Sequence, residues 1–536
     1  MKNNNVIIAG GGIAGSIAAA FLVKEGISVT LMEKEDQLGG LVNSFEREGY
    51  VFDGGLRAVE SSGLILSTLQ ELGIDLPLVK STVSLGVEDR IISLKETEDI
   101  QDFENLLKHF YPENGAEIEA IVLEIRKVMQ YMMVLLGNEA PVYSGGKKRD
   151  ARSLRKLLPW LVKLLATIPK LSKLGLPIEE HLKKFTRDPQ LTDIIKQHFF
   201  KGTPASFALS YFLFYFDYNY PLGGTGSLAR AVECYLREKG CDIRTNTKIC
   251  SLDPEEKEVR DQHGNVYGYD KLIWAADNKY LYSIIDTAQV AYKKLREGIE
   301  RKRASLRELR GAESVVSVYL GVDLPPSYFT SICTEHLFYT PDRRGISTAD
   351  PDRIKSWMRV NKPGGSKEDK AYIKQYLKDL FYYNTLEISF PVLRDPDLAP
   401  EGKTGMIVSV LFDYDLCRFI YDAGWYDEFK SYSEDLIIDI LDKSVFPGLK
   451  DSVEMRFSAT PLTLQQYTGN TDGAIVGWSF TNPVMPVPHS MIHMPKAVET
   501  VLPDVYQAGQ WTYSPAGLPI SILTGKVAAG KVKKKL

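Results

Sequence analysis

The chain has 536 residues, of which 44% are hydrophobic and 25% charged, a composition that excludes a disordered or fibrous protein. Its 65 basic and 69 acidic residues give a net charge of −4, which argues against a dedicated nucleic-acid binder, so we expect no nucleic-acid partner. The five cysteines form no Cys-x-x-Cys pair, so we expect no zinc site or disulfide framework and favour a reducing, cytoplasmic compartment.

The first forty residues predict a βαβ unit that binds a dinucleotide. Residues 6–9 are apolar, with β-branched residues among them, and predict a buried strand. A Gly-x-Gly-x-x-Gly turn follows, then an alanine- and leucine-rich helix at 16–25 and a second strand at 28–32 that ends on Glu33. A glycine-rich turn alone would fit unrelated α/β proteins, but the full order of elements favours the dinucleotide fold.

Each residue type in this unit has a physical reason. Gly10 permits the tight turn, Gly12 lets the backbone approach a pyrophosphate, and Gly15 lets the helix pack on the strand. The helix that follows the turn directs unpaired N–H groups and a positive dipole end at the phosphates. Glu33 suits a free ribose 2′-hydroxyl, which favours FAD or NAD over NADP.

Downstream segments resemble the FAD-containing amine oxidase and phytoene desaturase superfamily. The segments that carry the resemblance are residues 37–40, 49–55, 62–74, 220–228, 240–249, 270–277 and 505–519. Among them, 240–249 is similar to a strand whose backbone contacts the adenine, and the apolar helix after 517 is similar to one whose N-terminus points at the flavin. Residues 395–402 and 473–478 look most like the branch of phytoene desaturases, carotenoid isomerases and retinol saturases.

The resemblance implies an α/β fold. The FAD-binding domain is expected to be discontinuous, Rossmann-like and of the glutathione reductase type, with an α+β substrate or cap domain. The expected division is 1–90, 216–284 and 456–536 for FAD, 91–215 for a helical cap and 285–455 for substrate. The residues expected to hold FAD are Gly10, Gly12, Ile13, Ala14, Gly15, Glu33, Lys34, Gly39, Gly40, Leu41, Val42, Ile249, Gly509, Gln510, Gly517 and Leu518.

Two positions depart from the superfamily's common pattern. Leu41 stands where arginine is common, which removes one charged contact to the cofactor. Gln510 stands where aspartate is common, although glutamine can still hydrogen-bond a ribityl hydroxyl. Only one complete Gly-x-Gly-x-x-Gly follows a strand, so we expect no NADPH module and a separate electron donor or acceptor.

Two segments between the FAD motifs stand out. Residues 147–173 combine basic side chains with leucines and Trp160, a pattern that fits either an anionic membrane surface or an ordinary basic cap helix. The first alternative would place the protein at the inner face of the membrane. Residues 199–220 are dense in aromatics and fit either a plain core segment or the wall of a long apolar tunnel.

No catalytic residue can be assigned from the sequence. Arg57 and His336 are candidates, and His489 and His493 are conceivable acids or bases, although a single histidine is more often structural or exposed. We find no metal-ligand spacing and expect no metal.

The predicted activity is that of an FAD-dependent oxidoreductase acting on carbon–carbon bonds of an apolar polyene or isoprenoid substrate. The reaction would be desaturation, saturation or cis–trans isomerisation, by hydride exchange with flavin N5. The alternatives are a flavin oxidase of amines or porphyrinogens and a lipid carrier without redox activity.

Overall fold

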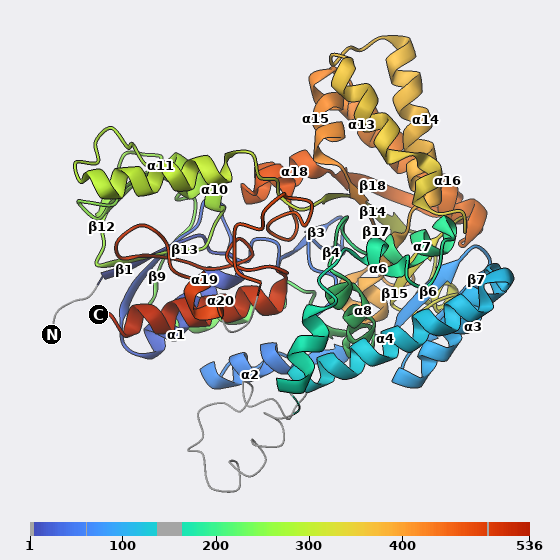
Figure 1. Ribbon diagram of the computed structural model, residues 1–536, viewed down its shortest axis with the longest axis horizontal. Coiled ribbons are helices and arrows are strands. Elements are labelled where there is room, and N and C mark those ends of the chain that lie inside the picture. The colour runs from blue at the N-terminus through green and yellow to red at the C-terminus, as the bar shows by residue number, and fades with distance from the viewer. Residues whose placement is uncertain (1–4, 61, 137–162, 164, 490–492) are drawn as a thin grey trace, which may run out of the picture.

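The computed structural model describes residues 5–60, 62–136, 163, 165–489 and 493–536. It has two lobes, each built around one sheet (Figure 1). The first sheet is parallel, with strand order β19-β13-β1-β2-β9. Its strands come from three separate parts of the chain: β1 (Asn5–Ala9), β2 (Ser28–Met32), β9 (Asp242–Arg244), β13 (Lys271–Trp274) and β19 (Val505–Gln507).

Both faces of this sheet are covered, which explains why its central strands β1 and β13 are mostly apolar. Val6 and Ile8 of β1 pack against the helices of one face, and Ile7 and Ala9 pack against the other. The first face carries α1 (Ile13–Lys24), α2 (Ser62–Leu72), α9 (Ser227–Glu238) and α20 (Leu518–Lys533). The second carries the antiparallel sheet β10 (Ile249–Asp253), β11 (Glu258–Asp261) and β12 (Val266–Gly268) and the helices α10 (Asn278–Ser283) and α11 (Lys293–Arg307).

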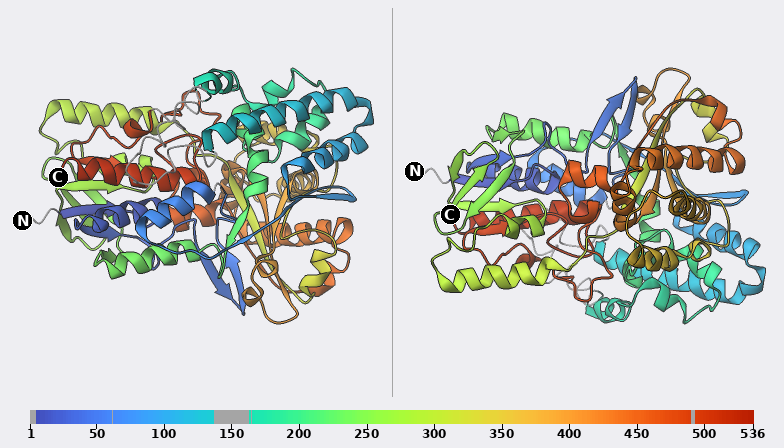
Figure 2. Two further views of the ribbon diagram at one scale, coloured as in Figure 1. Left: turned by 90° about the horizontal axis from the view of Figure 1, so that it is seen from below. Right: turned by 90° about the horizontal axis from the view of Figure 1, so that it is seen from above.

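The two ends of the chain meet in this lobe. Figure 2 shows α20 lying alongside α1. Gly525 makes the close approach possible, because a Cβ atom there would lie 2.3 Å from the Ala14 carbonyl oxygen. The N-terminal glycine turn and the C-terminal helix therefore border the same space.

The second lobe contains a seven-stranded sheet of order β18-β14-β17-β16-β15-β6-β7, antiparallel except for the β15–β6 pair. Its strands are β6 (Val83–Val87), β7 (Arg90–Leu94), β14 (Ser314–Val322), β15 (His336–Thr340), β16 (Leu386–Ser389), β17 (Thr404–Phe412) and β18 (Val453–Ala459).

Helices cover this second sheet in two groups. One group, which stands out as an arm in Figure 1, comprises α13 (Pro351–Val360), α14 (Lys367–Tyr383), α15 (Tyr414–Asp422) and α16 (Tyr426–Ser444). The other comprises α3 (Ile100–Phe110), α4 (Gly115–Leu136), α6 (Ile178–Leu182), α7 (Pro189–Lys196) and α8 (Ala205–Phe214). Within the described ranges, no helix is both long and apolar enough to cross a bilayer.

The predicted α/β class, with a Rossmann-like domain assembled from distant segments, is confirmed. The segment 240–249, expected as one strand, is two: β9 ends at Arg244 and β10 begins at Ile249 in a different sheet. Asn246 between them has a φ of 51°, which breaks the extended backbone. The domain boundaries given above stay a prediction.

Candidate functional site

The three glycines of the N-terminal turn have different surroundings. Gly10 has a φ of 104°, and its N–H donates to the Met32 carbonyl at 2.8 Å. A Cβ on Gly15 would lie 2.0 Å from the Gly10 carbonyl oxygen. Only glycine therefore allows α1 to pack this closely against the turn. A Cβ on Gly12 would meet nothing within 4 Å, because Gly12 faces an open cavity at the start of α1.

Glu33 ends β2 beside this turn. Its Oε2 accepts a 2.7 Å hydrogen bond from the Gly11 N–H, and its Oε1 accepts one of 2.9 Å from the Glu35 N–H. Burial raises the pKa of Glu33, and these backbone hydrogen bonds oppose the rise. Each carboxylate oxygen has room for a further donor, so the side chain can also accept from a ribose hydroxyl.

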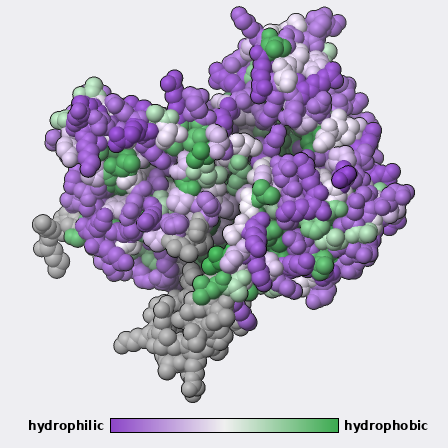
Figure 3. All heavy atoms as spheres, in the orientation of Figure 1, coloured by the Kyte–Doolittle hydropathy of each residue, from purple (hydrophilic) through white to green (hydrophobic). Residues whose placement is uncertain are grey.

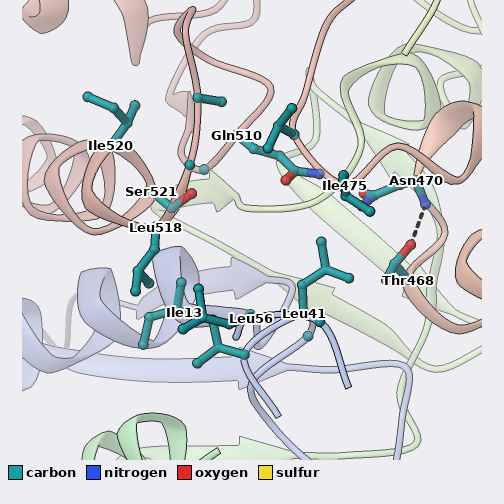
Figure 4. A pocket seen from close by; sticks show the side chains of 18 of the residues that line it. Ile13, Leu41, Leu56, Thr468, Asn470, Ile475, Gln510, Leu518, Ile520 and Ser521 are labelled. Atoms are coloured by element: carbon teal, nitrogen blue, oxygen red, sulfur yellow. Dashed lines mark hydrogen bonds between the residues drawn. The ribbon is translucent and has the colours of Figure 1, made fainter. Parts of the chain in front are cut away.

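One large cavity, of about 1060 Å³, brings the predicted FAD residues together. All of them line it except Gly15, whose role is the packing of α1. Figure 4 shows Ile13, Leu41 and Leu56 on one side of this space, facing Leu518 and Gln510 on the other.

The N-terminal end of α20 opens into the cavity. Gly517 precedes the helix with a φ of 138°, and Leu518 and Ser521 of the first turn line the space. The first N–H groups of a helix lack partners within the helix and carry the positive end of its dipole. This end of α20 can therefore stabilise negative charge on a bound group.

The residues present fit a dinucleotide. Gly12 offers open space next to the N-terminus of α1, which is where a pyrophosphate is held in this fold. Glu33 offers a hydrogen-bond acceptor, and Lys34 offers a positive charge. Both line the cavity. Inferred contacts to particular cofactor atoms remain a prediction.

The cavity continues beyond this region into an aromatic chamber. The segment 199–220 supplies both core and wall: Phe212 and Tyr215 are buried in the helical core, whereas Phe207 and Phe214 line the cavity. Aromatic side chains that line the chamber are Phe199, Phe200, Phe207, Tyr211, Phe214, Tyr218 and Phe338.

Arg57 lies where the two lobes meet and lines the cavity. Its guanidinium donates to the Asp53 carbonyl at 2.6 Å and to the hydroxyls of Ser409 at 3.1 Å and Ser317 at 3.4 Å. Since both serines belong to the seven-stranded sheet, Arg57 joins that sheet to the strand β4 (Tyr50–Asp53).

The histidines are placed differently. His336 is fully buried behind the cavity wall, with its Nδ1 3.2 Å from the Arg394 guanidinium. Its Nε2 lies 3.2 Å from Glu387 Oε1. Burial lowers the pKa of His336, and the Glu387 carboxylate opposes that fall. His489 lines the cavity, whereas His493 is exposed and does not.

Sequence reasoning missed two carboxylates that line the chamber, Glu60 and Glu387. A single glutamate between motifs carries no signal, because its position depends on strand pairing and loop packing. In the described part of the chain, no group of three or more His, Cys, Asp or Glu side chains is arranged to hold a metal.

Comparisons with known proteins agree with this geometry. A family model described as an NAD(P)-binding Rossmann-like domain matches residues 8–72. Prolycopene isomerase 1 of an Oncidium hybrid is 25% identical, covering 99% of this chain and 84% of its own. The 4,4′-diapophytoene desaturase of Staphylococcus aureus is 20% identical over 99% of both chains.

Solved structures support the same fold. An engineered variant of putrescine oxidase aligns over 99% of both chains with a TM-score of 0.59 and 12% identity. The chain therefore shares its fold with this oxidase, and its full-length similarity to a carotenoid isomerase and a carotenoid desaturase supports the predicted FAD-dependent oxidoreductase. The resemblance to the phytoene desaturase and carotenoid isomerase branch of the flavin amine oxidase superfamily is confirmed by the two relatives above. The catalytic and cofactor-contacting residues of this chain remain predictions.

Proposed function

We propose that this flavoenzyme acts on carbon–carbon bonds of an apolar polyene or isoprenoid substrate by exchanging hydride with flavin N5. The reaction is desaturation, saturation or cis–trans isomerisation. The observation that carries the proposal is the continuity of one cavity from Gly12 and Glu33 to the aromatic chamber around Phe207 and Phe338.

The chamber's chemistry suits such a substrate. Aromatic rings bury large apolar area and exclude water, and a conjugated chain offers π faces for them to contact. Bound FAD would supply the hydride acceptor or donor. The protein's own contribution is to orient the chain and to keep the chamber dry. The names of the relatives, prolycopene isomerase and diapophytoene desaturase, support this substrate class.

Replacing Phe207 with aspartate is expected to weaken polyene binding at least ~10-fold, because the variant places a charge in an apolar wall. Flavin content should stay unchanged. The measurement is the absorption shift of a polyene titrated into the flavin-loaded protein. Val360→Asp is the control, since Val360 is 82% exposed on α13. Unchanged polyene affinity in Phe207→Asp would place the substrate elsewhere.

We also propose that one edge of the molecule contacts an anionic bilayer. Of the basic segment 147–173, residues 147–162 and 164 lie outside the described residues. The described remainder is helical over 165–172, where Leu165 is 68% exposed and Lys170 is also exposed. Figure 3 shows apolar side chains gathered at this lower edge. Met132 and Leu171 line the cavity, so the substrate chamber reaches the same edge.

Exchanging Lys163, Lys170 and Lys173 for glutamate is expected to release the protein from anionic vesicles. Wild-type binding should also weaken with salt, because exposed charges are screened within ~8–10 Å at physiological ionic strength. Vesicle sedimentation measures both effects.

The control for vesicle binding is a second triple variant, with glutamate at the exposed Lys293, Lys294 and Lys362, which makes the same change in net charge elsewhere. Equal sedimentation of wild type and the first triple variant would reject the membrane contact.

A further inference from the structure

The substrate chamber contains two carboxylates in contrasting environments. Glu60 lies on the loop between β4 and α2, and Glu387 lies on β16. Both line the cavity, and the side chain of Glu387 is 32% exposed to it. A half-buried carboxylate in an apolar wall is costly, and an apolar residue would fill the wall more stably.

Glu387 is held as an anion. His336 Nε2 lies 3.2 Å from its Oε1. Burial acts to raise the pKa of Glu387, but the His336 imidazole and the positive charges of Arg57 and Arg394 outweigh it and lower the pKa below its ordinary value. Glu387 therefore carries a negative charge at neutral pH.

The Glu60 carboxyl has a different environment from that of Glu387. Within the described ranges no Lys, Arg or His lies at ion-pair distance from it, and its Oε1 accepts a 2.5 Å hydrogen bond from the Tyr211 hydroxyl. Burial raises the pKa of Glu60 to about 7, and the hydroxyls of Tyr211 and Tyr218 oppose the rise. The titratable groups that face it are Tyr211, Tyr215, Tyr218, Asp217 and Glu387.

Tyr211 itself is fixed. Its ring makes edge contacts with Phe199, Phe214 and Tyr215, at centroid distances of 5.8, 5.7 and 5.3 Å. The Tyr211 phenol therefore holds one oxygen of Glu60 in place at the wall of the chamber. Two carboxylates whose environments separate their protonation states are the pattern of an acid–base pair.

We infer that Glu60 is the acid–base residue of this chamber, exchanging its carboxyl proton with a carbon of a bound polyene, while the Glu387 carboxylate stabilises the positive charge that forms on the chain. The inference rests on the proposed function, since it assumes a polyene in the chamber. It adds a cis–trans isomerisation route that needs no net oxidation.

The step balances without a co-reactant. The Glu60 O–H bond breaks, and a C–H bond forms with the electron pair of one C=C bond. The neighbouring carbons then carry a delocalised positive charge, and the former double bond rotates as a single bond. Return of a proton from the same carbon to the Glu60 carboxylate restores the conjugated chain in its new geometry. The carbon skeleton is neither oxidised nor reduced.

Deuterium exchange tests this step. Flavin-loaded protein and a polyene are incubated in D₂O, and mass spectrometry follows deuterium entry into the recovered polyene. A carboxyl that exchanges its proton with solvent passes deuterium to the carbon. Glu60→Gln is expected to slow this entry at least ~100-fold, the range that general acid–base groups contribute.

The chain provides a matched control. Glu313 is a half-buried carboxyl whose pKa is raised to about 7 by desolvation, and it accepts a hydrogen bond from the Lys201 N–H at 2.8 Å, but it does not line the cavity. Glu313→Gln makes the same chemical change and should leave exchange at the wild-type rate. Glu60→Asp keeps a carboxyl and should retain part of the rate.

The pH dependence gives a second readout. The protonated form of Glu60 donates, and its fraction falls about tenfold per pH unit above a pKa of about 7. The rate of deuterium entry with wild-type protein should therefore fall as the pH rises above 7. The slower rate that remains in Glu60→Gln should not show this fall. A structural role for Glu60 would leave the shape of the profile unchanged.

The absorption shift of the bound polyene distinguishes failure of the Glu60 role from failure of the proposed function. If the polyene binds to both proteins and Glu60→Gln exchanges deuterium like wild type, the role of Glu60 is overturned and the proposed function stands. If no polyene binds to flavin-loaded wild type, the proposed function fails and the inference fails with it.

Discussion

Replacing Gly12 with valine is expected to give a folded protein that retains less than about a tenth of the wild-type FAD. Gly12 has a φ of −62°, and a Cβ there meets no protein atom within 4 Å. The valine side chain is therefore tolerated by the protein itself. It fills the space beside the start of α1 that phosphate oxygens need. Flavin absorbance per chain after purification measures the loss, and circular dichroism verifies the fold.

Valine variants of two other glycines serve as comparisons for Gly12→Val. Gly298 on α11 also has no atom within 4 Å of an added Cβ but does not line the cavity, so Gly298→Val should keep its flavin. Gly15→Val should lose the fold as well as the flavin, because of the 2.0 Å approach to the Gly10 carbonyl oxygen. Full flavin content in Gly12→Val would overturn the assignment of the phosphate site.

Reduction of the flavin by NADPH is expected to be slow and not saturable at micromolar concentration. Hydride transfer requires the donor carbon at ~3–3.5 Å from the acceptor, so a nicotinamide needs a site of its own. Glu33 and the glycine turn are assigned to FAD, and the end of α20 faces the same cavity. The sequence shows no second complete Gly-x-Gly-x-x-Gly after a strand. A separate carrier is then the expected electron partner.

Stopped-flow reduction with NADH, NADPH and dithionite measures this difference. Dithionite needs no binding site and serves as the positive control. Rapid, saturable reduction by micromolar NADPH would reveal a nicotinamide site and contradict the expectation of a separate electron carrier.

Local signals predicted the dinucleotide unit well. The apolar runs, the glycine turn and the helix at its side were expected within a few residues of β1, α1 and β2. They are encoded locally, because strand period, turn glycines and helix propensity act over short stretches. The C-terminal helix α20 was expected only from the family resemblance, and its close approach to α1 at Gly525 is a finding of the structure.

Non-local pairing could not be predicted. The contact between His336 and Glu387 depends on the antiparallel register of β15 and β16, in which His336 is paired with Ser389. The position of Glu60 depends on Tyr211, 151 residues away in the sequence. Nothing near 240–249 signalled the change of sheet at Asn246, because asparagine in the left-handed region is common in many loops.

Anaerobic incubation of the flavin-loaded protein with candidate polyenes, followed by chromatography of the products, tests the central claim most directly. Oxidised and dithionite-reduced protein are both incubated, so that either direction of hydride transfer, and isomerisation, can be detected. The account predicts a flavin-dependent product that differs from its polyene by two hydrogens, or a product that differs by the geometry of a double bond. Unchanged polyenes under both conditions, with flavin reduction by amines or porphyrinogens instead, would contradict it.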